Sequence, residues 1–304
     1  LLALLAILSL PGCSLAPKYV RPGTPLPDAA PVSWPQFENM ENAGWWSSFH
    51  STALPRLQAE GMARNRNFAA AGWQLAQAIA QSRAARAPLF PWIGAEGTAS
   101  RTGHHSGPND AFVMTDALSG GFQASYELDV WGRLRSQADS ASFMAEATLN
   151  DWRAVGLSLE SDIAIAYFQV LALRERLAVQ NEILSTTEQT LDYIAKQQRA
   201  GAASPLDLAR QRSEVASIKA RVQDLERQEQ AAKNALNNLL GAAMTPEELN
   251  GLMAAESITK LTPPPVSPGL PSSLLLRRPD VLKAEAALMA ANANIGAARA
   301  AFLP

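Results

Sequence analysis

The sequence predicts a mainly α-helical fold with a smaller β portion, built from two related halves. Apolar or small residues recur at alternating steps of three and four between Arg135 and Arg199, which is the pattern of a long packed helix. Residues Gly121–Val130 alternate between apolar and polar side chains, which is typical of a strand. The phrase ARAPLFP at Ala85–Pro91 returns as ARAAFLP at Ala298–Pro304, which indicates an internal repeat.

Composition and motifs exclude several classes of protein. The chain has 304 residues and a formal net charge of −2, so no nucleic-acid partner is expected. We find no nucleophile–base constellation and no glycine-rich phosphate loop, and therefore expect neither catalysis nor a cofactor. His104-His105 has only Asp110 nearby, so a solvated loop is favoured there over a metal site.

The first residues have the composition of a secretory signal. An apolar run, LLALLAILSLPG, precedes Cys13 and is too short to span a bilayer as a mature helix. Leu10–Cys13 resembles a bacterial lipoprotein cleavage box, which predicts lipidation of Cys13. The alternative is an unmodified cysteine in an ordinary signal peptide. No methionine or basic segment precedes the run, so we expect the natural N-terminus to lie further upstream.

A proline-rich segment separates this signal from the first helix. Because proline has a fixed φ and no amide donor, residues 13–40 are predicted to form an extended tether. The Ala-, Gln- and Arg-rich stretch Leu54–Ala87 predicts a helix, which Pro88 and Pro91 end.

Two strands are expected next, at Trp92–Ser100 and Gly121–Val130, joined by a polar loop over residues 101–111. Two strands of about ten residues are the pattern of a transmembrane β-barrel hairpin, although a soluble sheet gives the same alternation. In a barrel, one side of the second strand faces lipid and the other faces a wet lumen. The lipid-facing set is Phe122, Ala124, Tyr126 and Leu128, and the lumen-facing set is Gln123, Ser125, Glu127 and Asp129.

A long antiparallel helical hairpin follows the strands. At 1.5 Å per residue, Arg135–Arg199 forms a helix on the order of 100 Å long. Gly201 suits the left-handed residue that ends a helix. Ser204, Pro205 and Asp207 suit the N-cap, the first position and the capping box of the next helix. An apolar seam then runs back to Gly241, at Val215, Ile218, Val222, Leu225, Ala232, Leu236 and Leu239.

Five segments together resemble the outer-membrane efflux protein family, the TolC-like channels. The resemblance is strongest to the lipoprotein branch that works with resistance–nodulation–division pumps, the NodT/OprM-like proteins. The segments are GCSLAPKYVRP at Gly12–Pro22, WW at Trp45–Trp46, YELDVWGRLR at Tyr126–Arg135, RAGAASPLDL at Arg199–Leu208, and Arg277–Pro304 with its RRPDVLKAE and ANANIGAARAAFLP motifs.

The resemblance implies a homotrimer in the bacterial outer membrane that extends into the periplasm. Each subunit contributes four strands to one barrel and long helices to a tunnel. This chain would be the first half of an internally duplicated subunit, ending where a third strand begins. The implied function is a passive exit duct for small molecules such as drugs, working with a periplasmic adaptor protein and an inner-membrane pump. The adaptor would dock at Gly201, Ala202, Ser204, Leu206 and Asp207.

The alternative function is a non-channel periplasmic coiled-coil lipoprotein, either a scaffold or an adaptor tethered by Cys13. The alternating strand favours the channel. The expected organisation along the chain is an incomplete signal peptide at 1–12, the lipidated tether at 13–40, a helical region at 41–91, the β-hairpin at 92–130, the helical hairpin at 131–241 with its tip at 199–210, a connection at 242–276, and the second repeat at 277–304.

Overall fold

The computed structural model describes residues 15–23, 45–106, 111–242, 244–263 and 277–303. These residues divide into two compact units, and helices α3 and α4 run through both. The elements in chain order are η1 (Trp45–Phe49), α2 (Ala53–Arg64), α3 (Arg66–Arg86), η2 (Ala87–Leu89), β1 (Trp92–Ser106), β2 (Ala111–Ser125), α4 (Arg133–Arg199), α5 (Pro205–Leu239), α6 (Pro246–Leu252), η3 (Ile258–Lys260) and α7 (Pro279–Ala300).

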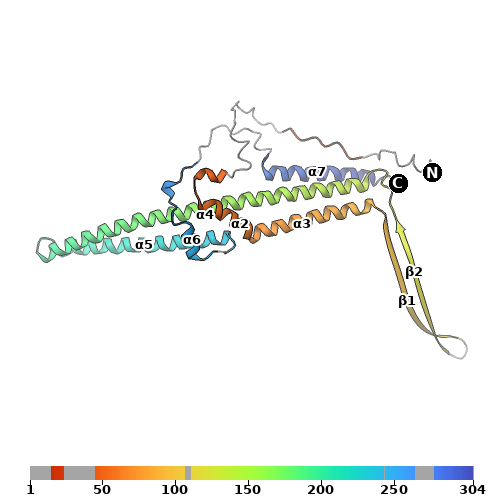
Figure 1. The fold of residues 1–304 in the computed structure, drawn as a ribbon, viewed down its shortest axis with the longest axis horizontal. Coiled ribbons are helices and arrows are strands. Elements are labelled where there is room, and N and C mark those ends of the chain that lie inside the picture. Colours follow the sequence, from red (N-terminus) through yellow and green to blue (C-terminus); the bar gives the residue numbers. More distant parts are fainter. Residues whose placement is uncertain (1–14, 24–44, 107–110, 243, 264–276, 304) are drawn as a thin grey trace. The chain divides into compact units, whose positions relative to one another are not determined.

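The long helical hairpin is confirmed as the antiparallel pair of α4 and α5 (Figure 1). The predicted seam of α5 is buried at Val215, Ile218, Val222, Leu225, Ala232 and Leu236. On α4, the seam positions Ile163 and Val170 are fully buried. The polar residue Thr187 interrupts the three-and-four spacing of apolar residues in α4. There, Gln211 of α5 donates a hydrogen bond of 3.3 Å to the backbone carbonyl of Thr187.

The hydrophobic core of the second unit lies where the helical hairpin of α4 and α5 packs against α2 and α6. Tyr167 is completely buried there, and its hydroxyl lies 2.9 Å from the Ser51 hydroxyl. Burial raises the pKa of Tyr167 to about 12. Glu256 accepts hydrogen bonds from the backbone N–H groups of Thr52 and Ala53 at 2.9 and 3.1 Å. The first backbone N–H groups of a helix have no partner within the helix, and the Glu256 carboxylate accepts hydrogen bonds from two such groups at the start of α2.

The single helix predicted over residues 54–87 is wrong, because Asn65 divides it into α2 and α3. Asn65 has an extended backbone, with φ −65° and ψ 123°. Its side chain accepts a hydrogen bond from the N–H of Phe68 and donates one to the carbonyl of Leu239. One residue thus caps α3 and ties it to the end of α5, a long-range contact that a helical composition does not reveal.

The internal repeat is present in the structure as two helices. An offset of 213 residues carries the first residue of α3, Arg66, onto the first residue of α7, Pro279. In the first unit, α7 packs against α4, where the Lys283 ammonium lies 2.7 Å from the Asp151 carboxylate. Small residues, Ala286, Ala290, Ala293, Gly296, Ala297 and Ala300, form the buried face of α7.

The β-hairpin is confirmed, but its strands are longer and end elsewhere than predicted. β1 and β2 pair antiparallel from Trp92–Ser125 to Ser106–Ala111, so most of the predicted loop over residues 101–111 is strand. Cross-strand pairs of complementary side chains continue the ladder there, including Arg101 with Asp116 and Thr102 with Thr115. Such pairs stabilise a sheet even where the apolar alternation ends.

Candidate functional site

The β-hairpin has one polar and one apolar face. Residues opposite each other in an antiparallel pair point to the same side of the sheet, and successive residues alternate between the sides. The polar face, in the described register, carries Gln123, Glu96, Thr98, Ser119, Ser100, Thr102 and Thr115. The apolar face carries Ile93, Ala124, Ala95, Phe122, Ala99 and Leu118, followed by Arg101 with Asp116.

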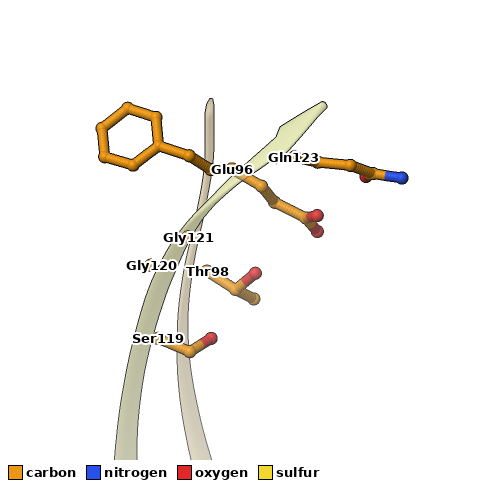
Figure 2. A pocket seen from close by; sticks show the side chains of 7 residues that line it. Glu96, Thr98, Ser119, Gly120, Gly121 and Gln123 are labelled. Carbon is orange, nitrogen blue, oxygen red and sulfur yellow. The ribbon is translucent and has the colours of Figure 1, made fainter. Parts of the chain in front are cut away.

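A shallow hollow of about 330 Å³ lies against the hairpin where its polar side chains gather. Figure 2 shows Glu96, Thr98, Ser119 and Gln123 extending toward the same side. Gly121 lies opposite Glu96 in the register, so no side chain covers the carboxylate from the paired strand. Glu96 is the one formal charge on the polar face of the described hairpin, since the charges of Arg101 and Asp116 lie on the other face.

The apolar face presents large side chains to its surroundings. Phe122 is 90% exposed and Leu118 is 87% exposed. Exposed apolar patches of this kind mark contact with a membrane or another protein. The structure thus places Phe122 and Ala124 on one face and Gln123 and Ser125 on the other, whereas the medium that each face meets stays a prediction.

The strand assignment of Tyr126, Leu128, Glu127 and Asp129 is wrong, because β2 ends at Ser125. The two carboxylates instead join the hairpin to the start of α4. Asp129 accepts hydrogen bonds from the backbone N–H groups of Leu134 and Arg135 at 3.0 and 2.9 Å. Glu127 pairs with Arg133 at 2.6 Å. Polar residues at alternating positions are compatible with a strand and with side chains that cap a helix. The alternation of residues 126–129 therefore could not distinguish between these two structures.

The pKa of Asp129 is lowered by its contacts at the helix start. Burial acts to raise this pKa, but the hydrogen bonds from the backbone of Arg135 and Leu134 and from the Arg135 guanidinium outweigh it. The first turn of a helix also favours a negative charge. Asp129 therefore acts as a structural carboxylate that fixes the direction of α4 where it leaves the hairpin.

The tip of the helical hairpin has the predicted turn chemistry. Gly201 has a φ of +78°, with no atom within 4 Å of the place where a side chain would begin. The Ser204 hydroxyl accepts from the N–H of Asp207 at 3.1 Å, and the Asp207 carboxylate accepts from the N–H of Ser204 at 3.2 Å. The Ser204 hydroxyl also donates to the Asp207 carboxylate at 2.7 Å. This hydrogen bond and the one from the Ser204 backbone N–H lower the pKa of Asp207. All five predicted docking residues, Gly201, Ala202, Ser204, Leu206 and Asp207, are exposed.

The N-terminal segment that the structure describes, residues 15–23, packs along α7. The Arg299 guanidinium donates to the carbonyl of Leu15, and Asn292 donates to the carbonyl of Pro17 at 2.8 Å. Arg21 pairs with Glu285, a turn or more further back along α7. The predicted tether is thus extended here, but it is bound to a helix. Cys13 lies outside the described residues.

The described part of the chain holds no group of three or more His, Cys, Asp or Glu side chains that could bind a metal. His104 lies in β1, opposite Val113, and not in the predicted loop. The sequence interpretation also missed the Arg101–Asp116 pair and the capping role of Asp129. For Asp129, the signal in the sequence was the glycine at position 132. Gly132 has a φ of 76° and ends the extended segment just before α4.

Comparison with known proteins identifies the class. The family model described as "Outer membrane efflux protein" matches residues 59–242. The cation efflux system protein CusC of Escherichia coli O6:H1 is 34% identical over 310 residues, covering 100% of this chain and 65% of its own length. The probable outer membrane lipoprotein SilC of Salmonella typhimurium is 33% identical, covering 100% of this chain and 66% of its own.

Solved structures agree with this result. A crystal structure of CusC superimposes with a TM-score of 0.79 at 33% identity, covering 95% of this chain and 64% of that chain. The open state of the MtrE outer membrane channel of Neisseria gonorrhoeae gives a TM-score of 0.77 at 28% identity, covering 96% and 64%. The fold is therefore that of an outer-membrane efflux channel subunit. The chain belongs to the outer membrane efflux protein family, is located in the outer membrane, and spans about two thirds of the length of these relatives.

Replacing Asp129 with Asn should loosen the first turn of α4. Because the folded pKa lies below the ordinary value, the stabilisation is present above the ordinary Asp pKa and is lost as pH falls through the lowered folded value. An amide keeps only one of the two acceptor oxygens that Asp129 uses and has no charge for the Arg135 guanidinium. We therefore expect amide exchange at residues 133–136 to rise roughly fivefold at neutral pH, the effect of losing about 1 kcal/mol of hydrogen bonding. Hydrogen–deuterium exchange mass spectrometry measures it.

Glu127→Gln is the matched control for this prediction, because Glu127 contacts the Arg133 side chain and is 57% exposed. It should leave the exchange nearly unchanged. After division by the intrinsic exchange rate at each pH, acidification should lower the protection factors of residues 133–136 in the parent protein and have little further effect in the Asp129→Asn variant. Equal protection in all three proteins would contradict the capping role.

Proposed function

We propose that the natural-length protein is a passive exit duct in a tripartite efflux system. The single observation that carries this proposal is the two-faced hairpin, which has a polar row that includes Glu96 and an apolar row that includes Phe122 and Leu118. A transmembrane barrel needs such strands, because alternate residues meet lipid and lumen. Family membership and the fold support the same function.

The duct performs no chemistry in this proposal. Its wall offers polar side chains to a wet path, and the energy for transport comes from an inner-membrane pump. Relatives are named for cation efflux, toluene efflux and pyoverdine export, so one architecture serves unlike substrates. We propose small molecules, such as drugs or metal ions, as the class of cargo for this chain. A non-channel scaffold would have no use for an exposed alternating hairpin.

The proposed duct is a homotrimer. The two strands of the described sheet pair only with each other, and an unpaired strand edge is not tolerated in hydrocarbon. Neighbouring strands, from the rest of the subunit and from other subunits, would close the barrel.

Lipidation of Cys13 remains a proposal, supported by the segment that follows it. Leu15 contacts Arg299 near the end of α7. Nearby, a side chain at Gly296 would lie 2.8 Å from Ser136, in the first turn of α4. β2 leads into that turn, so the described segment that follows the cysteine lies beside the chain that leaves the β-hairpin.

The tip is proposed to dock the periplasmic adaptor protein. It is exposed and consists of small side chains, so another protein can approach its backbone closely. Leu206 is 58% exposed and is the large apolar side chain among the five tip residues. Exposed apolar groups that lack an intramolecular partner are typical of a contact surface.

Replacing Glu96 with Gln should reduce the preference of the channel for cations. A negative charge on a narrow wet wall raises the local concentration of cations. We expect the potassium-to-chloride permeability ratio of the reconstituted natural-length trimer to fall by roughly two- to threefold, since salt screens part of the effect. Planar bilayer recordings measure the ratio.

Gln123→Glu is the reciprocal variant, because Gln123 lies on the same face as Glu96, and it should raise the ratio. Thr98→Val is the neutral control. The duct is contradicted if the purified trimer conducts no ions even with the adaptor protein bound. The lumen position of Glu96 is contradicted if the channel conducts and neither charge change alters the ratio.

Replacing Leu206 with Glu should weaken adaptor binding by about tenfold, a typical loss for one apolar contact residue. The Ser204–Asp207 capping box does not involve the Leu206 side chain, so the fold should be retained. Ser217→Glu, at an exposed α5 position away from the tip, is the control. Affinity for the purified adaptor is measured by surface plasmon resonance, and unchanged affinity for both variants would remove the tip from the interface.

A further inference from the structure

The Arg101–Asp116 ion pair lies in line with the apolar row of the hairpin. The register places the two residues directly opposite each other, one row beyond Ala99 and Leu118. The Arg101 Nε atom lies 2.8 Å from an Asp116 oxygen, and a second guanidinium nitrogen donates at 3.3 Å to the other oxygen. The two side chains are 67% and 68% exposed. A bidentate pair therefore ends the apolar row that begins at Ile93 and Ala124.

This pair is poorly suited to hydrocarbon. A guanidinium has five N–H donors, and Asp116 takes two of them. The neighbouring residues of the same face are Ala99, Leu118, Gly103 and Met114. Their side chains offer the other three donors no acceptor stronger than the thioether sulfur of Met114. Desolvating a charge pair whose remaining groups are unsatisfied is unfavourable, and charges on the lipid face of barrels destabilise most near the bilayer midplane.

The position of the pair matches the thickness of an outer membrane. The ladder begins at Trp92–Ser125, with Phe90 and Tyr126 exposed beside it, as in an interfacial aromatic girdle. From Trp92 to Arg101 the strand rises about 31 Å. With a tilt of about 40°, this length covers about 23 Å along the membrane normal, close to the apolar band of about 25 Å in such barrels.

We propose that the Arg101–Asp116 pair marks the outer limit of the lipid-embedded surface and binds the polar headgroups of the outer leaflet. This inference rests on the proposed channel function. Phosphate oxygens of the headgroups accept from the guanidinium donors that Asp116 leaves free, and water solvates the carboxylate. The strand residues beyond the pair, 102–106 and 111–115, then extend outside the bilayer. Phe112 and Met114 lie over Gly103 there, where no Cβ keeps their side chains away from the strand.

The pair gives the barrel a fixed depth in this proposal. Without its charges, the apolar side chains of Met114 and Phe112 would continue the apolar row outward. The ion pair lies between the apolar row that ends at Ala99 and Leu118 and the side chains of Met114 and Phe112. It keeps Met114 and Phe112 outside the hydrocarbon. A barrel whose depth is fixed also holds the periplasmic ends of its helices at a fixed distance from the membrane.

Spin-label depth measurements on the natural-length trimer test this proposal. Nitroxides are attached singly at Phe122, Leu118 and Met114, with the pair intact, in vesicles of phosphatidylethanolamine and phosphatidylglycerol. Relative accessibility to oxygen and to a water-soluble nickel chelate gives the depth of each label. We expect labels at Phe122 and Leu118 to lie in hydrocarbon and the label at Met114 to be at least fivefold more accessible to the nickel chelate.

Neutralising the pair is the decisive variant. Arg101→Gln with Asp116→Asn should move the label at Met114 toward the hydrocarbon and reduce its nickel accessibility at least twofold. Exchanging the charges, Arg101→Asp with Asp116→Arg, keeps a pair at the same row and should leave the depth as in the parent. A label at Met114 inside the hydrocarbon of the parent, or no shift on neutralisation, would overturn the proposal. Free nickel access at Phe122 as well would overturn the channel function itself.

Discussion

The backbone hydrogen bonds of the β-hairpin impose the constraint on which the rest of the account depends. The backbone N–H and C=O groups of β1 and β2 form hydrogen bonds with each other along the edge that the strands share. Each strand also has a second edge, along which further N–H and C=O groups point away from the hairpin. In water these groups bind solvent, whereas in hydrocarbon they must bind other strands. An exposed apolar row with Phe122 and Leu118 can therefore meet lipid only if further strands close the sheet. The proposed homotrimer meets that requirement, because its other strands would close the sheet.

The chain continues from the β-hairpin into the helices. Asp129 fixes the first turn of α4 as the chain leaves the hairpin. The helix then continues without interruption to Arg199. The capping box at Ser204 reverses the chain sharply. No loop interrupts α4 between its first residue and the tip. In the proposed duct, opening depends on a partner protein at that tip.

Local patterns predicted the helical hairpin well, and long-range contacts account for the differences from prediction. The α4–α5 seam and the Gly201–Asp207 turn depend on residues close in sequence, so periodicity and capping rules were sufficient. The break at Asn65 depends on the carbonyl of Leu239. The strand ends depend on cross-strand pairs such as Arg101–Asp116, and the role of Asp129 depends on a helix that begins four residues later. A short stretch of alternating apolar and polar residues carries no information about these partners. The candidate wall was therefore predicted for Phe122–Ser125 and misplaced for residues 126–129.

Thiol accessibility along β2 tests the two-faced wall most directly. Single cysteines are placed at each position from Leu118 to Ala124 of the natural-length trimer in lipid vesicles, and a membrane-impermeant maleimide is applied against the parent protein as background. The account predicts a period of two, with labelling at Ser119, Gly121 and Gln123 and protection at Leu118, Gly120, Phe122 and Ala124. Uniform labelling of all seven positions would contradict it, since both faces of the hairpin would then meet water.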